Sequence, residues 1–154
     1  MSVQPPFDPA AAHRWFSGDF FNRVWEYLEK NDRSCEDSEK MLSLAHASLA
    51  HWRLREDATP QNFSIGYWQV SRVYAVLGMA ELAHRYGVLS LHAAENEPPF
   101  YRAYAHEAIA RAAQVGGDDA TRMEHLEKAR ALLDEIEDDE ERALLEPDLS
   151  ELAS

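Results

Sequence analysis

The segment from Tyr67 to Gly78 constrains the fold most, because its pattern predicts one nearly all-apolar helix. It reads YWQVSRVYAVLG, with a single charged residue, Arg72, and a glycine at its end. A helix that is apolar on almost every side is buried among other helices, and glycine readily takes the left-handed conformation that ends helices. We therefore expect an all-α protein without strands, with this helix at its centre.

Start signals place further helices along the chain. Asp8 and Thr59 each precede a proline, the arrangement of a capping residue followed by proline at the first helical position. Gly18 is expected to break the first helix into two parts. Ser34, with Asp37 three residues later, resembles a capping box and predicts a second helix. The expected buried stripe of that helix is Leu42, Ala45, Leu49 and Trp52.

Two stripes mark the helix after Gly78. The expected core positions of the helices on either side of this turn are Phe63, Tyr67, Val70, Tyr74 and Leu77, and then Leu82, Tyr86, Leu89 and Ala93. A neighbouring ridge of small residues consists of Ala83, Gly87, Ser90 and Ala94. Small side chains let another helix backbone approach closely, so we expect Gly87 to pack against a neighbouring helix.

Prolines and glycines also mark the later helices. The proline pair at 98–99 opens a fifth helix and the glycine pair at 116–117 forms the next turn. The expected core positions of the fifth and sixth helices are Tyr101, Ala105, Ala108, Ala112 and Val115, and then Met123, Leu126, Ala129, Leu133 and Ile136. A short acidic helix is expected over 138–145, ending before Pro147.

Length and composition predict one domain. A chain of 154 residues, 45% of them hydrophobic, can bury a single core. We expect a flexible N-terminal arm over residues 1–7, one all-helical domain over 8–146 and an acidic C-terminal tail over 147–154.

The charge is strongly negative and unevenly placed. The chain has 28 acidic and 15 basic residues and a formal net charge of -13. Residues 134–154 alone hold ten acids and one base, a net charge of -9. Negative charge repels phosphate backbones and anionic membrane surfaces, so we expect neither nucleic acid nor a membrane as a partner.

The cysteine count and the N-terminus predict a cytoplasmic protein. Cys35 is the one cysteine and cannot form an internal disulfide. The first residues, MSVQPPFDP, lack the basic start and apolar run of a signal peptide. No stretch approaches the ~18 uninterrupted apolar residues of a membrane span.

The two hairpins around Gly78 and Gly117 resemble tetratricopeptide repeats. The glycines lie 39 residues apart (117 minus 78), and the second hairpin, GGDDATRMEHLEKARAL, is especially similar. The period exceeds the ~34 residues of the standard repeat, and Arg122 stands where a small alanine is usual. The resemblance implies antiparallel helix hairpins stacked as a short right-handed array.

A narrower resemblance covers roughly residues 20–148. The segments AHASLAHW (45–52), YWQVSRVYAVLG (67–78) and HEAIARA (106–112) are similar to a family of small bacterial helical proteins of no named activity. This resemblance implies a repeat-like helical fold and supplies no catalytic residues.

Arg72 is the first candidate for a binding site. A guanidinium in an apolar helix needs charged or hydrogen-bonded partners. With Trp68 and Ser71 beside it, Arg72 can hold an anionic or carboxylate ligand. The alternative is an internal pair between Arg72 and a glutamate.

The fifth helix offers the other half of this site. Tyr104, Glu107 and Arg111 fall at spacings of three and four and can point into the same space as Trp68 and Arg72. Glu107 and Arg111 can equally form an ordinary pair on a helix surface. His46 is a further candidate for this pocket.

The histidines and Cys35 predict neither a metal nor catalysis. His106 and Glu107 begin like the zinc motif H-E-x-x-H, but Ala110 replaces the second histidine. Glu81 and His84 supply one half of a di-iron motif, which needs two. We expect no metal and no cofactor.

Three functions compete. The first is a non-enzymatic protein that binds a peptide or protein in a groove between the first helices of its hairpins, as tetratricopeptide arrays commonly do. The second is a small-molecule binder or enzyme with a pocket around Trp68, Arg72, Tyr104 and Glu107. The third is a homodimer that pairs through the exposed aromatic part of the first helix.

Overall fold

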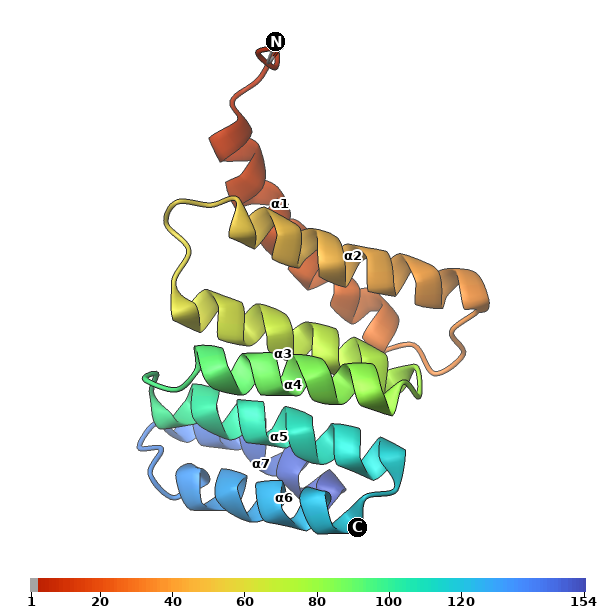
Figure 1. The fold of residues 1–154 in the computed structure, drawn as a ribbon, viewed down its shortest axis with the longest axis vertical. Helices are drawn as coiled ribbons and strands as arrows, with labels where there is room; N and C mark the ends of the chain where they lie inside the picture. The colour runs from red at the N-terminus through yellow and green to blue at the C-terminus, as the bar shows by residue number, and fades with distance from the viewer. Residues whose placement is uncertain (1–2) are drawn as a thin grey trace. The chain divides into compact units, whose positions relative to one another are not determined.

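The computed structural model describes residues 3–154, and the chain is helical throughout (Figure 1). Seven α-helices and no strand occur within these residues, so the predicted all-α class is confirmed. None of the described helices combines the length and apolarity that a membrane crossing requires. The pattern of contacts divides the chain into two compact units, unit 1 (Met1–Thr59) and unit 2 (Pro60–Ser154). This division does not test the single domain predicted for 8–146, since compact units can belong to one domain or to two.

Unit 1 is a helical hairpin of α1 (Pro9–Leu28) and α2 (Cys35–Arg53). Its predicted start signals are confirmed: the Asp8 side chain accepts a hydrogen bond from the Ala10 N–H, and Ser34 and Asp37 form both bonds of a capping box. Residues 3–7 precede α1 and are exposed. Residues 1–2 of the predicted arm lie outside the described residues.

The predicted break at Gly18 is wrong, because α1 runs through it. A glycine inside a helix costs only about 1 kcal/mol, and contacts with α2 hold this part of α1 in place. The Ser48 hydroxyl donates to the Ser17 carbonyl at 2.7 Å, next to the glycine.

The hydrophobic core of unit 1 is small. Its buried apolar side chains are Val24, Met41, Ala45 and Leu49. Of the predicted α2 stripe, Ala45 and Leu49 are buried, whereas Leu42 and Trp52 are half-buried. The Arg55 guanidinium lies over the Trp52 ring, 4.0 Å from its centroid, which explains why Trp52 sits at the edge of the core.

Unit 2 consists of two hairpins and a final helix. The elements are α3 (Pro60–Val76), α4 (Ala80–Ala93), α5 (Pro99–Gly116), α6 (Asp119–Leu133) and α7 (Asp139–Leu152). The predicted turns are confirmed: Gly78 and Gly117 have φ angles of 75° and 72°, in the left-handed region. Consecutive helices pack as hairpins, α3 with α4 and α5 with α6.

The central helix of unit 2 is α5, not the predicted α3. It contacts α3, α4, α6 and α7, and six of its eighteen residues are buried alanines that let neighbouring helices come close on several sides. Ala105, Ala108 and Ala112 are buried as predicted, whereas Tyr101 is half-buried and Val115 is exposed.

The ridge of small residues is the buried face of α4. The stripe of larger residues, which was expected to form the core, is less buried. Ala83, Gly87, Ser90 and Ala94 are buried, whereas Leu82 is exposed and Tyr86, Leu89 and Ala93 are half-buried. A Cβ on Gly87 would lie 3.0 Å from Ile109 Cγ1 and 3.2 Å from the Ile109 nitrogen. The backbones of α4 and α5 are therefore too close for larger residues.

Gly87→Leu is expected to destabilise the protein by about 1–3 kcal/mol through overpacking. Gly18→Ala is the control, because a Cβ at Gly18 meets nothing within 4 Å and should stabilise the helix by about 0.4–1 kcal/mol. Urea denaturation followed by circular dichroism measures both. Equal stabilities of the parent and Gly87→Leu would contradict the close packing of α4 on α5.

The C-terminal region differs most from the prediction. Instead of a helix that ends at Leu145 and a loose tail over 147–154, α7 continues through Pro147 to Leu152. Leu145, Leu149 and Leu152 are buried in one core cluster with residues of α5 and α6. In the sixth helix Leu126 and Ala129 are buried as predicted, Ile136 is buried just after it, Leu133 is half-buried and Met123 is exposed.

Two arginines hold α7 in place. Arg122 donates to the Leu152 carbonyl at 2.6 Å, and Arg142 donates to the Leu133 carbonyl at 2.6 Å. Pro147 has no N–H to donate to the turn before it, but it is exposed and the buried leucines on the other side outweigh this lost bond. The residues after Pro147 are thus part of the folded unit.

Candidate functional site

Five of the seven predicted site residues come together in unit 2. Trp68 and Arg72 lie one turn apart on α3, and Tyr104, Glu107 and Arg111 lie along one side of α5. The Arg72 guanidinium is 3.3 Å from Glu107 Oε1, and the Trp68 and Tyr104 rings meet edge to face at 5.3 Å. The predicted meeting of the two helices at these residues is present in the structure.

Glu107 is the centre of this polar network. Its side chain is 0% exposed, yet three donors surround its carboxylate. Arg111 Nε donates to Oε1 at 2.6 Å, Arg72 Nη1 to the same oxygen at 3.3 Å, and Trp68 Nε1 to Oε2 at 2.8 Å. Charge-assisted bonds of this kind offset the cost of burying a carboxylate.

Asp148 of α7 completes the network. Its Oδ1 lies 3.5 Å from Arg111 Nη2 and 3.6 Å from Arg72 Nη2, and its Oδ2 accepts from the Tyr104 hydroxyl at 3.2 Å. The same hydroxyl lies 3.0 Å from the Leu144 carbonyl, near the backbone position that Pro147 disturbs. The sequence interpretation missed Asp148 because it placed this residue in a loose tail.

The electrostatics of the network keep Tyr104 and Arg111 protonated, so that both donate hydrogen bonds. Burial raises the pKa of Tyr104, and the negative charges of Asp148 and Glu107 raise it further, so the hydroxyl stays protonated. Burial alone would lower the pKa of Arg111, but the charge and hydrogen bond of Glu107 raise it overall. Arg111 therefore faces the carboxylates as a cation.

The network is satisfied by its own members. Within residues 3–154, every buried side-chain nitrogen and oxygen has a hydrogen-bond partner. Two arginines balance the two carboxylates of Glu107 and Asp148, and together they join α3, α5 and α7. The pairing of Arg72 with Glu107 is the internal pair that the sequence left open as the alternative to ligand binding. We call the network an internal strut, because it ties the three helices together. Ligand binding by these residues stays a prediction.

The two remaining candidates lie elsewhere. Ser71 is buried against α4 and donates to the Ala83 carbonyl at 2.7 Å. His46 belongs to α2 of unit 1, where burial lowers its pKa. Neither is a member of the polar network.

A shallow groove lies between α1 and α2 of unit 1. It encloses about 580 Å³ and is lined by apolar and charged side chains of both helices. Its lining residues are Phe20, Arg23 and Tyr27 of α1 and Glu36, Glu39, Lys40, Ser43, Leu44 and Ala47 of α2. Phe20, Leu44 and Ala47 are half-buried, whereas the charged lining residues are exposed, so the groove has an apolar floor and a charged rim.

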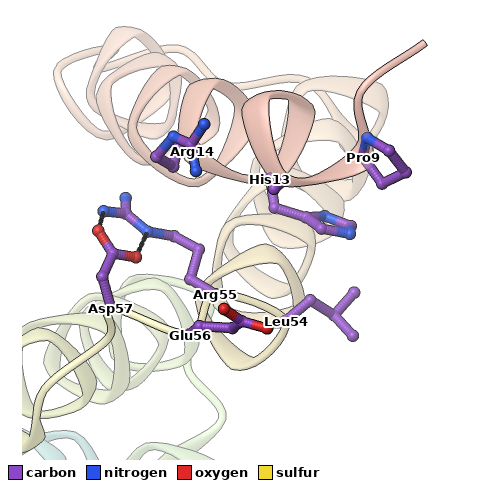
Figure 2. A pocket seen from close by; sticks show the side chains of 8 residues that line it. Pro9, His13, Arg14, Leu54, Arg55, Glu56 and Asp57 are labelled. Carbon is purple, nitrogen blue, oxygen red and sulfur yellow. Dashed lines mark hydrogen bonds and ion pairs between the residues drawn. The ribbon is translucent and has the colours of Figure 1, made fainter.

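A second pocket lies at the other end of the same hairpin (Figure 2). It encloses about 410 Å³ and is lined by Pro9, Ala10, His13 and Arg14 of α1 and by Leu54, Arg55, Glu56 and Asp57 after α2. Arg55 is held by a bidentate pair with Asp57, at 2.8 and 2.7 Å, and by a bond to the Ser17 hydroxyl at 3.0 Å. The wall of this pocket is therefore fixed by internal bonds.

An aromatic cluster joins the two depressions. Phe16, Phe20, His13 and His51 lie with ring centroids 5.0–5.6 Å apart, and the Nδ1 atoms of the two histidines are 2.8 Å apart. His13, Phe20 and Tyr27 repeat every seven residues on α1, and Lys40, Ala47 and Leu54 do so along α2 and its end. Residues seven apart share a helix face, so these side chains form one elongated face, which we call the α1–α2 surface.

The sequence interpretation named the exposed aromatic part of the first helix as a possible dimer surface, but it did not find the groove that this helix forms with α2. It expected a groove between the first helices of successive hairpins, whereas this surface lies between the two helices of one hairpin. The seven-residue spacing of His13, Phe20 and Tyr27 is the signal that could have indicated it.

The histidines do not gather as metal ligands. Within residues 3–154, no three His, Cys, Asp or Glu side chains lie in a geometry that could hold a metal ion. His106 of α5 and His125 of α6 instead form a pair, with their Nδ1 atoms 2.9 Å apart.

The His106–His125 pair predicts a loss of stability in mild acid. Burial, and then the positive charges of His125, Lys128 and Arg102, lower the pKa of His106 to about 4, although Glu124 opposes this. The pKa of a histidine in an unfolded chain is about 6.5. Between pH values of about 4 and about 6.5 the unfolded chain therefore binds more protons than the folded chain, and stability is lost as the pH falls through this range. Urea denaturation at several pH values should show a slope that is shallower in His106→Gln. An unchanged slope in this variant would contradict the role of the pair.

Comparisons of this chain with protein-family models, with curated proteins and with solved structures found no match.

Proposed function

We propose that this protein is a non-enzymatic interaction protein whose α1–α2 surface binds a helical segment of a protein partner. One observation carries the proposal: two depressions on one face of unit 1 are joined by an aromatic cluster. Exposed apolar surface rimmed by polar residues is typical of protein-binding sites.

The shape and chemistry of the surface suit a helix. From His13 to Tyr27 it extends over 14 residues of α1 (27 minus 13), roughly 21 Å at 1.5 Å per residue, which is about four helical turns. An amphipathic helix binds a groove through apolar side chains on one face while its polar face stays in water. Phe20, Leu44 and Ala47 provide the apolar floor, and Arg23 and Glu39 belong to the rim.

The resemblance of the hairpins to tetratricopeptide repeats supports the same class of function, by analogy of fold alone. Cytoplasmic location belongs to this proposal too, since Cys35 is a free, exposed thiol of the kind that reducing compartments maintain.

A small-molecule pocket around Trp68, Arg72, Tyr104 and Glu107 has less support. The charged groups that would recognise a ligand are bonded to one another, so a ligand must displace buried internal pairs. An enzymatic function at that site therefore stays the second choice.

Affinity capture with three matched baits tests the proposal. The baits are the full chain, Ala47→Arg on the groove floor and Ala131→Arg on an exposed position of α6. We expect at least one protein to be retained by the parent and by Ala131→Arg but lost with Ala47→Arg, with unchanged circular dichroism in all three. Retention of the same proteins by all baits would overturn the proposal, as would retention of none by a parent chain that also fails to pair with itself.

A further inference from the structure

We infer that the partner bound at the α1–α2 surface is a second copy of this chain, an inference that rests on the proposed function. Two hairpins that meet through this surface form a four-helix arrangement with two-fold symmetry.

No aromatic side chain of α1 is buried. Of the aromatic side chains on the α1–α2 surface, Phe16 is 37% exposed, and Phe20 and Tyr27 are half-buried. The buried apolar residues in the described part of unit 1 are few, and none of them is aromatic, while aromatic residues offer the largest area for burial. A pair of helices has too little interior to enclose such side chains, whereas four helices around one core do enclose them.

The charges that line the α1–α2 surface differ between its two helices. The charged lining residues of α1 are the basic Arg14 and Arg23. Those of α2 and the turn after it are mainly acidic, with Glu36, Glu39, Glu56 and Asp57 against Lys40 and Arg55. The lining of α1 thus has an excess of two positive charges, and that of α2 with its turn an excess of two negative charges. Within one copy Arg23 also pairs with Asp19 at 3.7 Å and Lys40 with Glu36 at 2.7 Å.

The charges of this surface are complementary to those of a second copy of the same surface. In a two-fold dimer the same patch is used by both copies, and α1 of one copy can face either α1 or α2 of the other. Facing α1 helices would bring arginines together, whereas α1 on α2 brings Arg14 and Arg23 toward the mainly acidic lining of α2 in the second copy.

The balance of charge also argues against a strongly basic partner. The whole chain carries a net charge of -13, but the lining of the α1–α2 surface holds four acidic residues and four basic ones. A basic partner would be attracted to residues 134–154, where the negative charge is concentrated, rather than to this neutral surface.

Light scattering of the purified full chain over a wide range of concentrations tests the inference. We expect a mass of about twice the 17.6 kDa of the chain, and Ala47→Arg should be monomeric while Ala131→Arg remains dimeric. Arg23→Glu and Glu39→Lys should each raise the dissociation constant by about tenfold, and the two changes together should restore much of the affinity because each copy again presents opposite charges. Circular dichroism checks that every variant folds.

A mass of 17.6 kDa at all concentrations would overturn the inference, as would a dimer that Ala47→Arg leaves intact. A different protein that is captured by the parent and lost with Ala47→Arg, while the purified chain stays monomeric, would also overturn it and leave the proposed function standing. Loss of both the dimer and any Ala47-dependent capture would overturn the two proposals together.

Discussion

Arg111→Met is expected to lower the free energy of unfolding by about 3–5 kcal/mol, because it removes the closest partner of a fully buried carboxylate. Glu107 is 0% exposed and receives its shortest bond, 2.6 Å, from Arg111. Arg72 cannot replace it, since Arg72 lies at 3.3 Å and is partly exposed. Urea denaturation followed by circular dichroism measures the loss.

A double variant is the control for this prediction. Glu107→Leu together with Arg111→Met removes both charges and should recover much of the stability, because apolar residues of similar size often replace buried ion pairs at little cost. Arg72 and Asp148 can still pair in that variant. If Arg111→Met alone unfolds at the same urea concentration as the parent, the network is not a structural strut.

Truncation after Glu146 is expected to cost about 3–6 kcal/mol, since each buried leucine that is lost contributes about 1.5–3 kcal/mol. The deletion removes Leu149 and Leu152 from the core cluster of unit 2 and Asp148 from the polar network. Thermal and urea denaturation measure the effect. Unit 2 should then be poorly folded, with its tryptophan Trp68 more exposed to solvent.

Truncation after Leu152 is the matched control, because it removes only Ala153 and Ser154, which are exposed. This shorter deletion should leave the denaturation midpoint unchanged. Equal stability of both truncated proteins would show that α7 does not cap the core.

Local signals in the sequence predicted most helix boundaries. Asp8 before Pro9 and the Ser34–Asp37 capping box set the starts of α1 and α2, and Gly78 and Gly117 set the turns of unit 2. Each of these signals acts within a few residues of the backbone that it shapes. Such features can be predicted from a single sequence.

Features that depend on packing between distant segments were harder to predict. Proline at 147 indicated the end of a helix, but the leucines at 145, 149 and 152 have enough apolar area to hold the helix in place beyond it. The sequence predicted close packing at the small ridge of α4, but it did not show that this ridge is buried more completely than the stripe of larger residues beside it.

The candidate site was predicted only in part, because it too depends on packing between distant segments. Spacings of three and four placed Tyr104, Glu107 and Arg111 along one side of a helix, and they do meet Arg72. A further member of the network, Asp148, comes from a helix that the sequence interpretation ended too early. Whether charged groups bind a ligand or one another depends on such a partner, which local spacing does not show.

The α1–α2 surface is the place where we propose that a protein binds. Site-specific photo-crosslinking in living cells tests this directly, with a photoreactive phenylalanine analogue at Leu44 in the groove and, as the control, at Leu144, an exposed leucine of α7. We predict a crosslinked protein adduct from position 44 that is absent from position 144. No adduct from position 44, or the same adducts from both positions, would contradict protein binding at the α1–α2 surface.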